Sequence, residues 1–151
     1  MPFTSTPDQP IAALTDLGRM NFARAANGEI SFVVSDFAVG RGGYDMLDPV
    51  KISVIDPSLT DLEDHIFPAI PNIQPIEKLE YPTLSTVVVY CRLAQADAIA
   101  GLGELGIYGE IIYSPISPGE VGTKFLMAVA HSPLVTKTLK QVILYRIIIQ
   151  F

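Results

Sequence analysis

The residues best suited to chemistry lie between Asp61 and His65, where the chain reads Asp-Leu-Glu-Asp-His. Carboxylates and imidazoles bind divalent metals and act as general acids and bases. A metal site, however, needs ligands that converge from several directions, and neighbours on one short turn point apart. No second group of ligands stands out elsewhere in the sequence. We therefore interpret this segment as a solvated acidic turn and assign no metal ligand, no cofactor-binding residue and no catalytic residue.

Nucleophilic catalysis has two further candidates, Cys91 and the pair His131–Ser132. A triad needs a histidine beside the nucleophile and an acid to orient it, and neither candidate lies in an elbow motif such as G-x-S-x-G. Adjacent residues of a strand point to opposite faces, so His131 and Ser132 should not meet. Cys91 is the single cysteine and ends the apolar run Val87–Cys91, which indicates a buried small hydrophobe. We expect that the chain is not an enzyme.

The loop Gly40–Gly43 carries three glycines in four positions, as some phosphate-binding loops do. A phosphate cradle opens a helix and usually carries Lys followed by Ser or Thr. Here Tyr44 and Asp45 follow, which favours a turn between two strands. Carbohydrate binding through Tyr44, Tyr90 or Tyr108 stays open, although the chain has no tryptophan to supply a stacking platform.

The composition and charge of the chain argue against several classes of function. The 151 residues suit a single domain, 1–151, and the net charge is −6. The ten basic residues are scattered singly, which argues against nucleic-acid binding and against an anionic membrane surface. No apolar run is long enough to span a membrane. Charged residues make up 17% of the chain and hydrophobic residues 49%, so either the core is generous or partner chains cover apolar surface.

The elements that must position these residues follow from periodicity. Residues 1–10, rich in Pro, Ser and Thr, predict an extended arm. Thr15 predicts the cap of a helix from Asp16 to Asn27, which Gly28 ends; Phe22, Ala25 and Ala26 should face the core. Period-two alternation then predicts strands over Ile30–Val39, Val50–Ile55, Thr83–Gln95, Glu104–Tyr113, Gly122–His131 and Val142–Phe151.

Two connecting segments and the last strand complete the prediction. Residues Thr60–His65 are expected to form one helical turn. The segment Phe67–Pro82 holds four prolines and should be a long connection with at most an edge strand. Residues Val142–Phe151 are apolar on both faces, so this strand should pair inside the sheet or against another subunit. The predicted fold is α+β, an antiparallel β-sandwich-like core with one N-terminal α-helix.

Several segments, taken in order, resemble the N-terminal domain of the phage tail-collar fibre proteins of contractile-tailed phages and tailocins. Leu14–Gly18 opens the helix, Phe37–Gly43 is similar to the family's AVGxGxG turn, and Glu104–Gly109 is similar to its EIGLF strand. They are followed by Phe125–Ala130, then by Pro133 and Lys137. The region from Asp56 to Pro82 matches no pattern of the family.

The resemblance implies a structural virion protein of a phage-type tail. Family members usually continue into a fibre shaft and a receptor-binding tip, whereas this sequence ends at Phe151. The expected role is therefore a tail-fibre attachment module or a baseplate-peripheral adaptor, located in the virion tail and assembled in the host cytoplasm. Its expected partners are other tail-fibre and baseplate chains and further copies of itself, a trimer being the first expectation. The alternative is a small receptor- or carbohydrate-binding β-domain that contacts the host surface.

Overall fold

The computed structural model describes residues 3–5, 11–69 and 72–150 of the chain. In this part most residues belong to strands, and one α-helix, α1 (Asp16–Ala26), follows the second strand. The broad α+β class is thus confirmed. The remaining elements are β1 (Phe3–Ser5), β2 (Ile11–Leu14), β3 (Ser31–Gly40), β4 (Tyr44–Asp45), β5 (Asp48–Ile52), β6 (His65–Phe67), β7 (Gln74–Pro75), β8 (Lys78–Thr83), β9 (Thr86–Leu93), β10 (Gly101–Tyr113), the 3-10 helix η1 (Pro118–Glu120), β11 (Lys124–Thr136) and β12 (Gln141–Gln150).

The main sheet is mixed, which corrects the expectation of a purely antiparallel core. Its strand order is β6-β3-β10-β11-β2-β12-β9-β8, with β1 added to β12 and β7 added to β3. Hairpin neighbours such as β10 and β11 are antiparallel, but β12 runs parallel to both β1 and β2. These strands come from opposite ends of the chain, so no short hairpin forces them to run in opposite directions.

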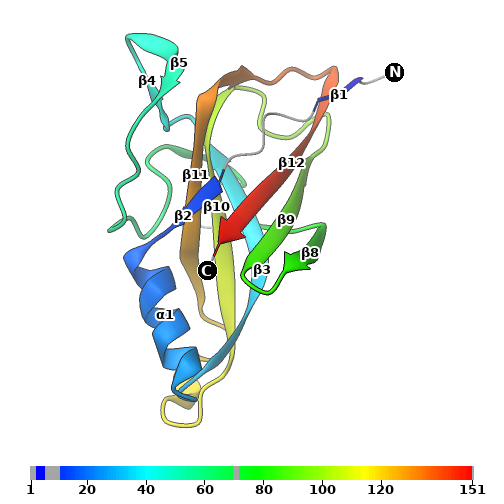
Figure 1. Ribbon diagram of the computed structural model, residues 1–151. Helices are drawn as coiled ribbons and strands as arrows, with labels where there is room; N and C mark the ends of the chain where they lie inside the picture. Colours follow the sequence, from blue (N-terminus) through cyan, green and yellow to red (C-terminus); the bar gives the residue numbers. More distant parts are fainter. Residues whose placement is uncertain (1–2, 6–10, 70–71, 151) are drawn as a thin grey trace.

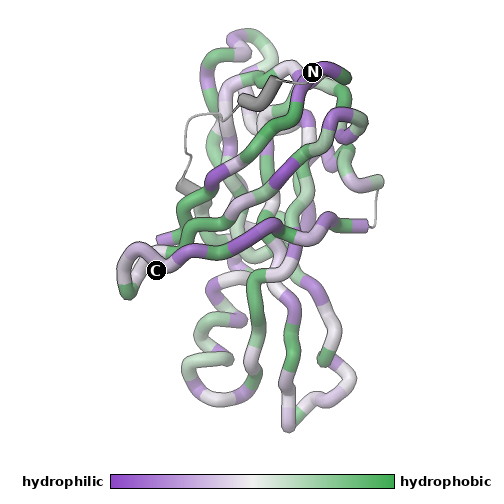
Figure 2. The backbone as a smooth tube through the Cα atoms, turned by 90° about the vertical axis from the view of Figure 1, so that its right-hand side faces the viewer, coloured by the Kyte–Doolittle hydropathy of each residue, from purple (hydrophilic) through white to green (hydrophobic). Residues whose placement is uncertain are grey.

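The core lies between two groups of strands. Strands β9 and β12 cross in front of β3, β10 and β11 (Figure 1), and one buried cluster joins side chains of both groups. Hydrophobic stretches run along these strands (Figure 2), and residues 102–109 of β10 and 125–131 of β11 are buried without interruption, so both faces of these two strands are covered there. Among the largest fully buried side chains are Phe37, Ile107, Met127, Ile143 and Ile147. No helix in the described ranges is both long and apolar enough for a membrane crossing.

The helix begins at Asp16, as the sequence predicts, and ends at Ala26, one residue before the predicted end at Asn27. The Thr15 hydroxyl oxygen accepts a hydrogen bond from the Gly18 amide at 3.0 Å and donates one to the Leu126 carbonyl at 2.6 Å. The cap therefore also fastens the helix to β11. The close packing of α1 on β11 requires glycine at position 18, because a Cβ there would lie 2.2 Å from the carbonyl oxygen of Met127. Gly28, with φ of 74°, follows the helix in the left-handed conformation.

The last strand is interior, as predicted. β12 pairs with β9 along Ile143–Gln150 and with β2 at Ile148 and Ile149. The side chains of Ile147 and Ile149 are fully buried. The expected edge strand is also present, since β8 ends the sheet and includes Pro82. Of the predicted arm, Phe3–Ser5 forms β1, and residues 1–2 and 6–10 lie outside the described part.

Three expectations are wrong in detail. Ala26 is exposed, because the core-facing side of α1 ends at Phe22 and Ala25. Residues 60–64 form turns without a helix, and β6 begins at His65. In place of the predicted strand Val50–Ile55, the structure has β5 from Asp48 to Ile52, which lies outside the main sheet and, among the described residues, pairs only with β4.

Candidate functional site

A protruding hairpin, β4–β5, is the most exposed apolar feature of the described chain. It projects at the upper left of the molecule, away from the main sheet (Figure 1). The exposed fractions of its large apolar side chains and of one that follows it are 82% for Met46, 96% for Leu47, 77% for Val50, 53% for Ile52 and 92% for Val54. A two-stranded hairpin is marginally stable in water by itself, so its base has to be held by the rest of the protein.

Backbone contacts hold the base of this hairpin. The Ser53 amide donates a hydrogen bond to the Gly43 carbonyl at 3.0 Å, which closes the base. Gly43 has a φ of 92°, and a Cβ there would lie 2.1 Å from the carbonyl oxygen of Gly103 in β10. Glycine is therefore needed at position 43 both for the left-handed conformation and for the close approach to β10.

Glu104 of β10 is buried and holds two loops through its carboxylate. Oε1 accepts hydrogen bonds from the amides of Gly42, at 3.3 Å, and Asp64, at 2.7 Å. Oε2 accepts one from the amide of Glu63 at 3.1 Å. These bonds explain why residues 60–64 are not helical, since a helix would turn the same amide groups toward its own carbonyls or into solvent. A buried carboxylate that accepts three amide hydrogen bonds fixes both loops to the sheet.

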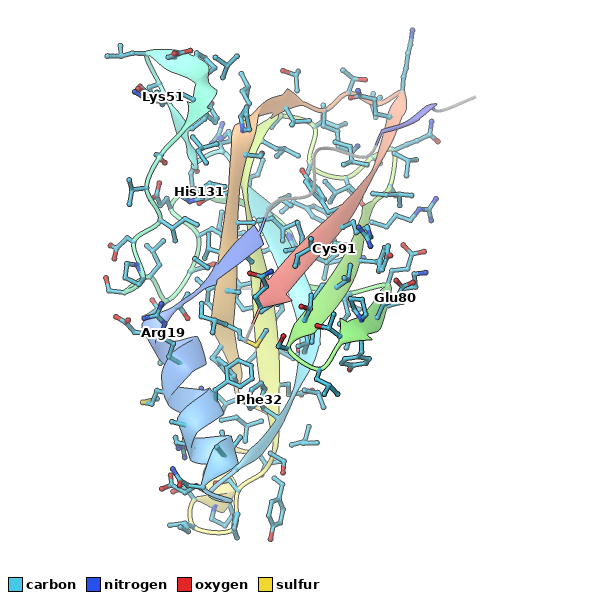
Figure 3. All side chains as sticks on the ribbon, viewed as in Figure 1. Arg19, Phe32, Lys51, Glu80, Cys91 and His131 are labelled. Carbon is cyan, nitrogen blue, oxygen red and sulfur yellow. The ribbon has the colours of Figure 1, made fainter. Side chains whose placement is uncertain are left out.

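His131 of β11 holds the other side of the hairpin base. Its Nδ1 lies 2.9 Å from the Ser53 carbonyl oxygen, so this nitrogen carries the proton and donates. The ring is buried, and Figure 3 shows it between β11 and the hairpin that carries Lys51. The Ser132 hydroxyl instead donates to the carbonyl of Pro133. His131 and Ser132 therefore do not meet, as the strand geometry predicted.

The acidic turn is not simply solvated, which corrects the sequence interpretation. The Asp61 carboxylate lies 2.9 Å from Nδ1 of His65 and accepts a hydrogen bond from the hydroxyl of Tyr108. The side chain of His65 is only 2% exposed, whereas that of Asp61 is 41% exposed. Asp61 and His65 are four residues apart and converge because the turn is anchored by Glu104, which lies about 40 residues further along the chain.

This hydrogen-bonded group shifts the acidity of two of its members. Burial alone would raise the pKa of the Asp61 carboxyl, but hydrogen bonds from Tyr108, the Leu62 amide and His65 together outweigh burial and lower it. Burial, with the Asp61 hydrogen bond, raises the pKa of the Tyr108 hydroxyl far above its ordinary value. Both shifts favour a charged Asp61 that accepts from a neutral Tyr108, which is a structural arrangement for the turn.

Two further polar candidates, Cys91 and Lys137, are buried. Cys91 is fully buried, and burial strongly raises the pKa of its thiol, so little nucleophilic thiolate forms. Lys137 is 1% exposed and its Nζ donates to the carbonyl of Gln95 at 3.0 Å, which ties down the loop after β9. Burial lowers the pKa of Lys137. Within the described ranges, no three His, Cys, Asp or Glu side chains are placed to hold a metal ion.

A second apolar feature lies at the other end of the molecule. A groove of about 490 Å³ runs between α1, the first half of β3 and the edge strand β8. The residues that line this groove are Phe22, Ala25, Ile30, Ser31, Phe32, Val33, Val34, Leu79, Tyr81 and Val87. Sequence reasoning singled out neither the groove nor the exposed hairpin as a site. The alternation Val50-Lys51-Ile52-Ser53-Val54 predicts a strand at the hairpin. It does not show whether another element covers the apolar side chains of that strand.

The comparisons with known proteins add no relative. Family models, curated proteins and solved structures all give no match for this chain.

Proposed function

We propose that the chain is a structural protein of a phage-type tail, acting as a tail-fibre attachment or baseplate-peripheral adaptor module. Its work would be to present rigid, complementary surfaces to neighbouring chains, with no catalytic step. Other tail-fibre and baseplate chains would be its partners, and it would form a homo-oligomer, a trimer being the first expectation. Its location would be the virion tail, after assembly in the host cytoplasm.

One observation carries this proposal: the segments that resemble the tail-collar family adjoin one another in the fold. Phe37–Gly40 and Phe125–Ala130 lie in β3 and β11, the two strands that flank Glu104–Gly109 of β10. The segment Leu14–Gly18 is fastened to the same unit through the Thr15 hydroxyl and Leu126. Segments that are far apart in the sequence thus form one continuous structural unit, which supports a common origin for the set.

We infer further that this unit is the inner layer of a sandwich-like core. The buried cluster that joins β3, β10 and β11 with β9 and β12 supports this inference, because each group contributes one apolar face. Within this unit, glycines of β10 also allow side chains of the neighbouring strand β11 to pack closely. A Cβ on Gly106 would lie 2.8 Å from a methyl carbon of Leu126, and a Cβ on Gly109 would lie 2.7 Å from the ring of Phe125. A rigid core of this kind suits a module that transmits force.

The proposal is tested on contractile-tail particles from the same genome. Particles made without this chain should lack their fibres at the baseplate in electron micrographs, and supply of the wild-type chain should restore them. Gold-labelled antibody against the chain should decorate the tail end of wild-type particles. Fibres that attach normally in the absence of the chain, or particles that carry none of it, would refute the proposal.

The alternative receptor- or carbohydrate-binding role has no specific support among the three tyrosines considered. Tyr108 is buried and its hydroxyl is bound to Asp61. The ring of Tyr90 is covered by Lys78, whose Nζ lies 4.4 Å from the ring centroid. Tyr44 is half-buried, and its ring lies against Gly103 of β10. None of the three rings is an open platform for a sugar, so we do not propose this role.

A further inference from the structure

The groove between β3 and β8 is an open seam in the main sheet. On one edge, Ser31–Val34 of β3 pairs with β10. On the other edge, β6 and β7 pair only with residues further along β3, from Asp36 to Gly40. Within the described part of the chain, no strand pairs with the second edge of Ser31–Val34. β8 pairs only with β9, so its outer edge is open as well.

The seam has the properties of a strand-binding site. Its lining comes from both open strands and from Phe22 and Ala25 of α1. The volume of about 490 Å³ is roughly three times the ~150 Å³ cavity that holds a benzene-sized ring, so several apolar side chains fit in it. An extended segment can add to an open sheet edge through backbone hydrogen bonds while alternate side chains fill pockets.

The hairpin of the same chain carries the complementary surface. Val50 and Ile52 of β5 lie on either side of Lys51 in the sequence, so their side chains share one face of the strand. Val54 follows the end of the strand and is 92% exposed. All five residues of β5 are exposed, and its only partner in the described ranges is β4. The hairpin and the seam lie at opposite ends of the molecule, as the positions of Lys51 and Phe32 show (Figure 3). One copy therefore cannot bring its own hairpin into its own seam.

We propose that the hairpin of one copy of this chain docks into the β3–β8 seam of a second copy. Val50 and Ile52 turn into the groove, and the free edge of β5 lies along the open edge of Ser31–Val34. Because the two surfaces differ, the contact is head-to-tail, and repetition gives a ring where the rotation closes. This proposal stands apart from the tail-module role, because it rests only on these two surfaces.

The size of the contact suits a stable assembly. Five exposed apolar side chains of the hairpin region offer roughly 500 Å² of apolar area, near the largest patch of a typical monomer. With the backbone and polar atoms around them, the contact approaches the roughly 800 Å² per partner of stable interfaces. The hairpin base is already fixed by Gly43 and by His131, so little conformational freedom is lost on docking.

The test uses one variant for each surface and then mixes them. Val50→Glu places a charge on the hairpin, and Val33→Glu places one in the seam; these positions are 77% and 42% exposed, so neither change enters the core. In sedimentation velocity the wild type should assemble, and each variant alone should be monomeric, with self-association weakened on the order of tenfold or more. Lys51→Ser, on the opposite face of β5, should assemble as the wild type does.

A mixture of the Val50→Glu and Val33→Glu chains tests whether the hairpin of one copy binds the seam of another. The Val50→Glu chain keeps an intact seam and the Val33→Glu chain keeps an intact hairpin, so an equimolar mixture should form a dimer of one chain of each kind. A monomeric wild type, variants that still assemble, or a mixture that stays monomeric would each overturn the proposal. A monomeric wild type would mean that another protein fills the seam, a variant that still assembles would mean that like surfaces meet, and a monomeric mixture would mean that the hairpin and the seam do not bind each other. Circular dichroism verifies the fold, and Leu47→Glu with Tyr81→Glu provides a second pair should either first variant unfold.

Discussion

Glu104 and His131 are directly opposed partners on the neighbouring strands β10 and β11, and both hold the base of the same exposed hairpin. Glu104 accepts from the Gly42 amide before the hairpin, and His131 donates to the Ser53 carbonyl after it. Both side chains are buried. Hydrogen bonds from buried polar groups to the backbone favour one arrangement of that backbone. The structure thus uses its buried polar residues to hold an apolar arm in a fixed direction.

Glu104→Gln should lower the free energy of unfolding by about 1–3 kcal/mol. The NH₂ group of the new glutamine is a hydrogen-bond donor, and it would face the Glu63 amide, whose hydrogen bond the carboxylate now accepts. Urea denaturation measures the loss. Hydrogen exchange should also quicken at the amide of Glu63, whose bond to Oε2 is lost when the NH₂ group takes the place of that oxygen. Glu110→Gln, on the same strand, is the control and should change neither quantity appreciably. Unchanged exchange in the Glu104 variant would contradict the assigned role.

Gly40→Ala should destabilise the protein by about 1–3 kcal/mol or more, because the added methyl group overpacks a filled site. A Cβ at this position would lie 2.3 Å from Oε1 of Glu104 and 2.5 Å from the carbonyl oxygen of Asp64. Gly119→Ala is a matched control, since a Cβ there would meet nothing within 4 Å. Equal melting temperatures for the two variants would show that the close packing at Gly40 is unimportant.

Local features of this fold were predictable from the sequence, and long-range ones were not. The helix could be placed because Thr15 and Gly28 are signals that act within a few residues. The convergence of Asp61 and His65 could not, since it depends on Glu104, a residue far along the chain. Period-two alternation marked Val50–Ile55 as a strand, but the pattern does not state which element, if any, covers the apolar row. The parallel pairing of β2 with β12 likewise depends on contacts between the two ends of the chain.

Asp61 should make stability depend on pH in the acid range. Its pKa in the folded protein is lowered from an ordinary value of 3.8, so it contributes stability that is fully present above that value. The contribution is lost as the pH falls below 3.8 toward the lower pKa of the folded state. Tyr108→Phe removes one hydrogen bond to the carboxylate and should make this acid dependence shallower. Urea midpoints measured across this range test it; identical slopes for wild type and variant would refute the assignment.

Cys91 should be unreactive in the folded protein. Burial, and to a smaller extent the charge of Glu77, raises the pKa of its thiol, so almost no thiolate is present at about pH 8. A chromogenic disulfide reagent should modify one thiol per chain in concentrated urea and almost none under native conditions. The slow native reaction then reports the opening of β9 against β12. Rapid modification of the native protein would mean that the strand is not held as described.

The interior position of β12 predicts a large difference between two isoleucines. Ile147 is fully buried between β9 and the core, whereas Ile112, near the end of β10, is 51% exposed. Ile147→Ala should cost about 2–5 kcal/mol, because it removes buried methyl groups and leaves a cavity. Ile112→Ala should change stability by no more than roughly 0.5 kcal/mol.

Deletion of residues 147–151 would remove Ile149 as well, and the combined loss is comparable to the roughly 5–15 kcal/mol that stabilises a typical domain. The shortened chain should therefore be unfolded or insoluble, as judged by circular dichroism and by recovery after centrifugation. A shortened chain that stays folded with the melting temperature of the wild type would show that the pairing of β12 with β9 contributes little to stability.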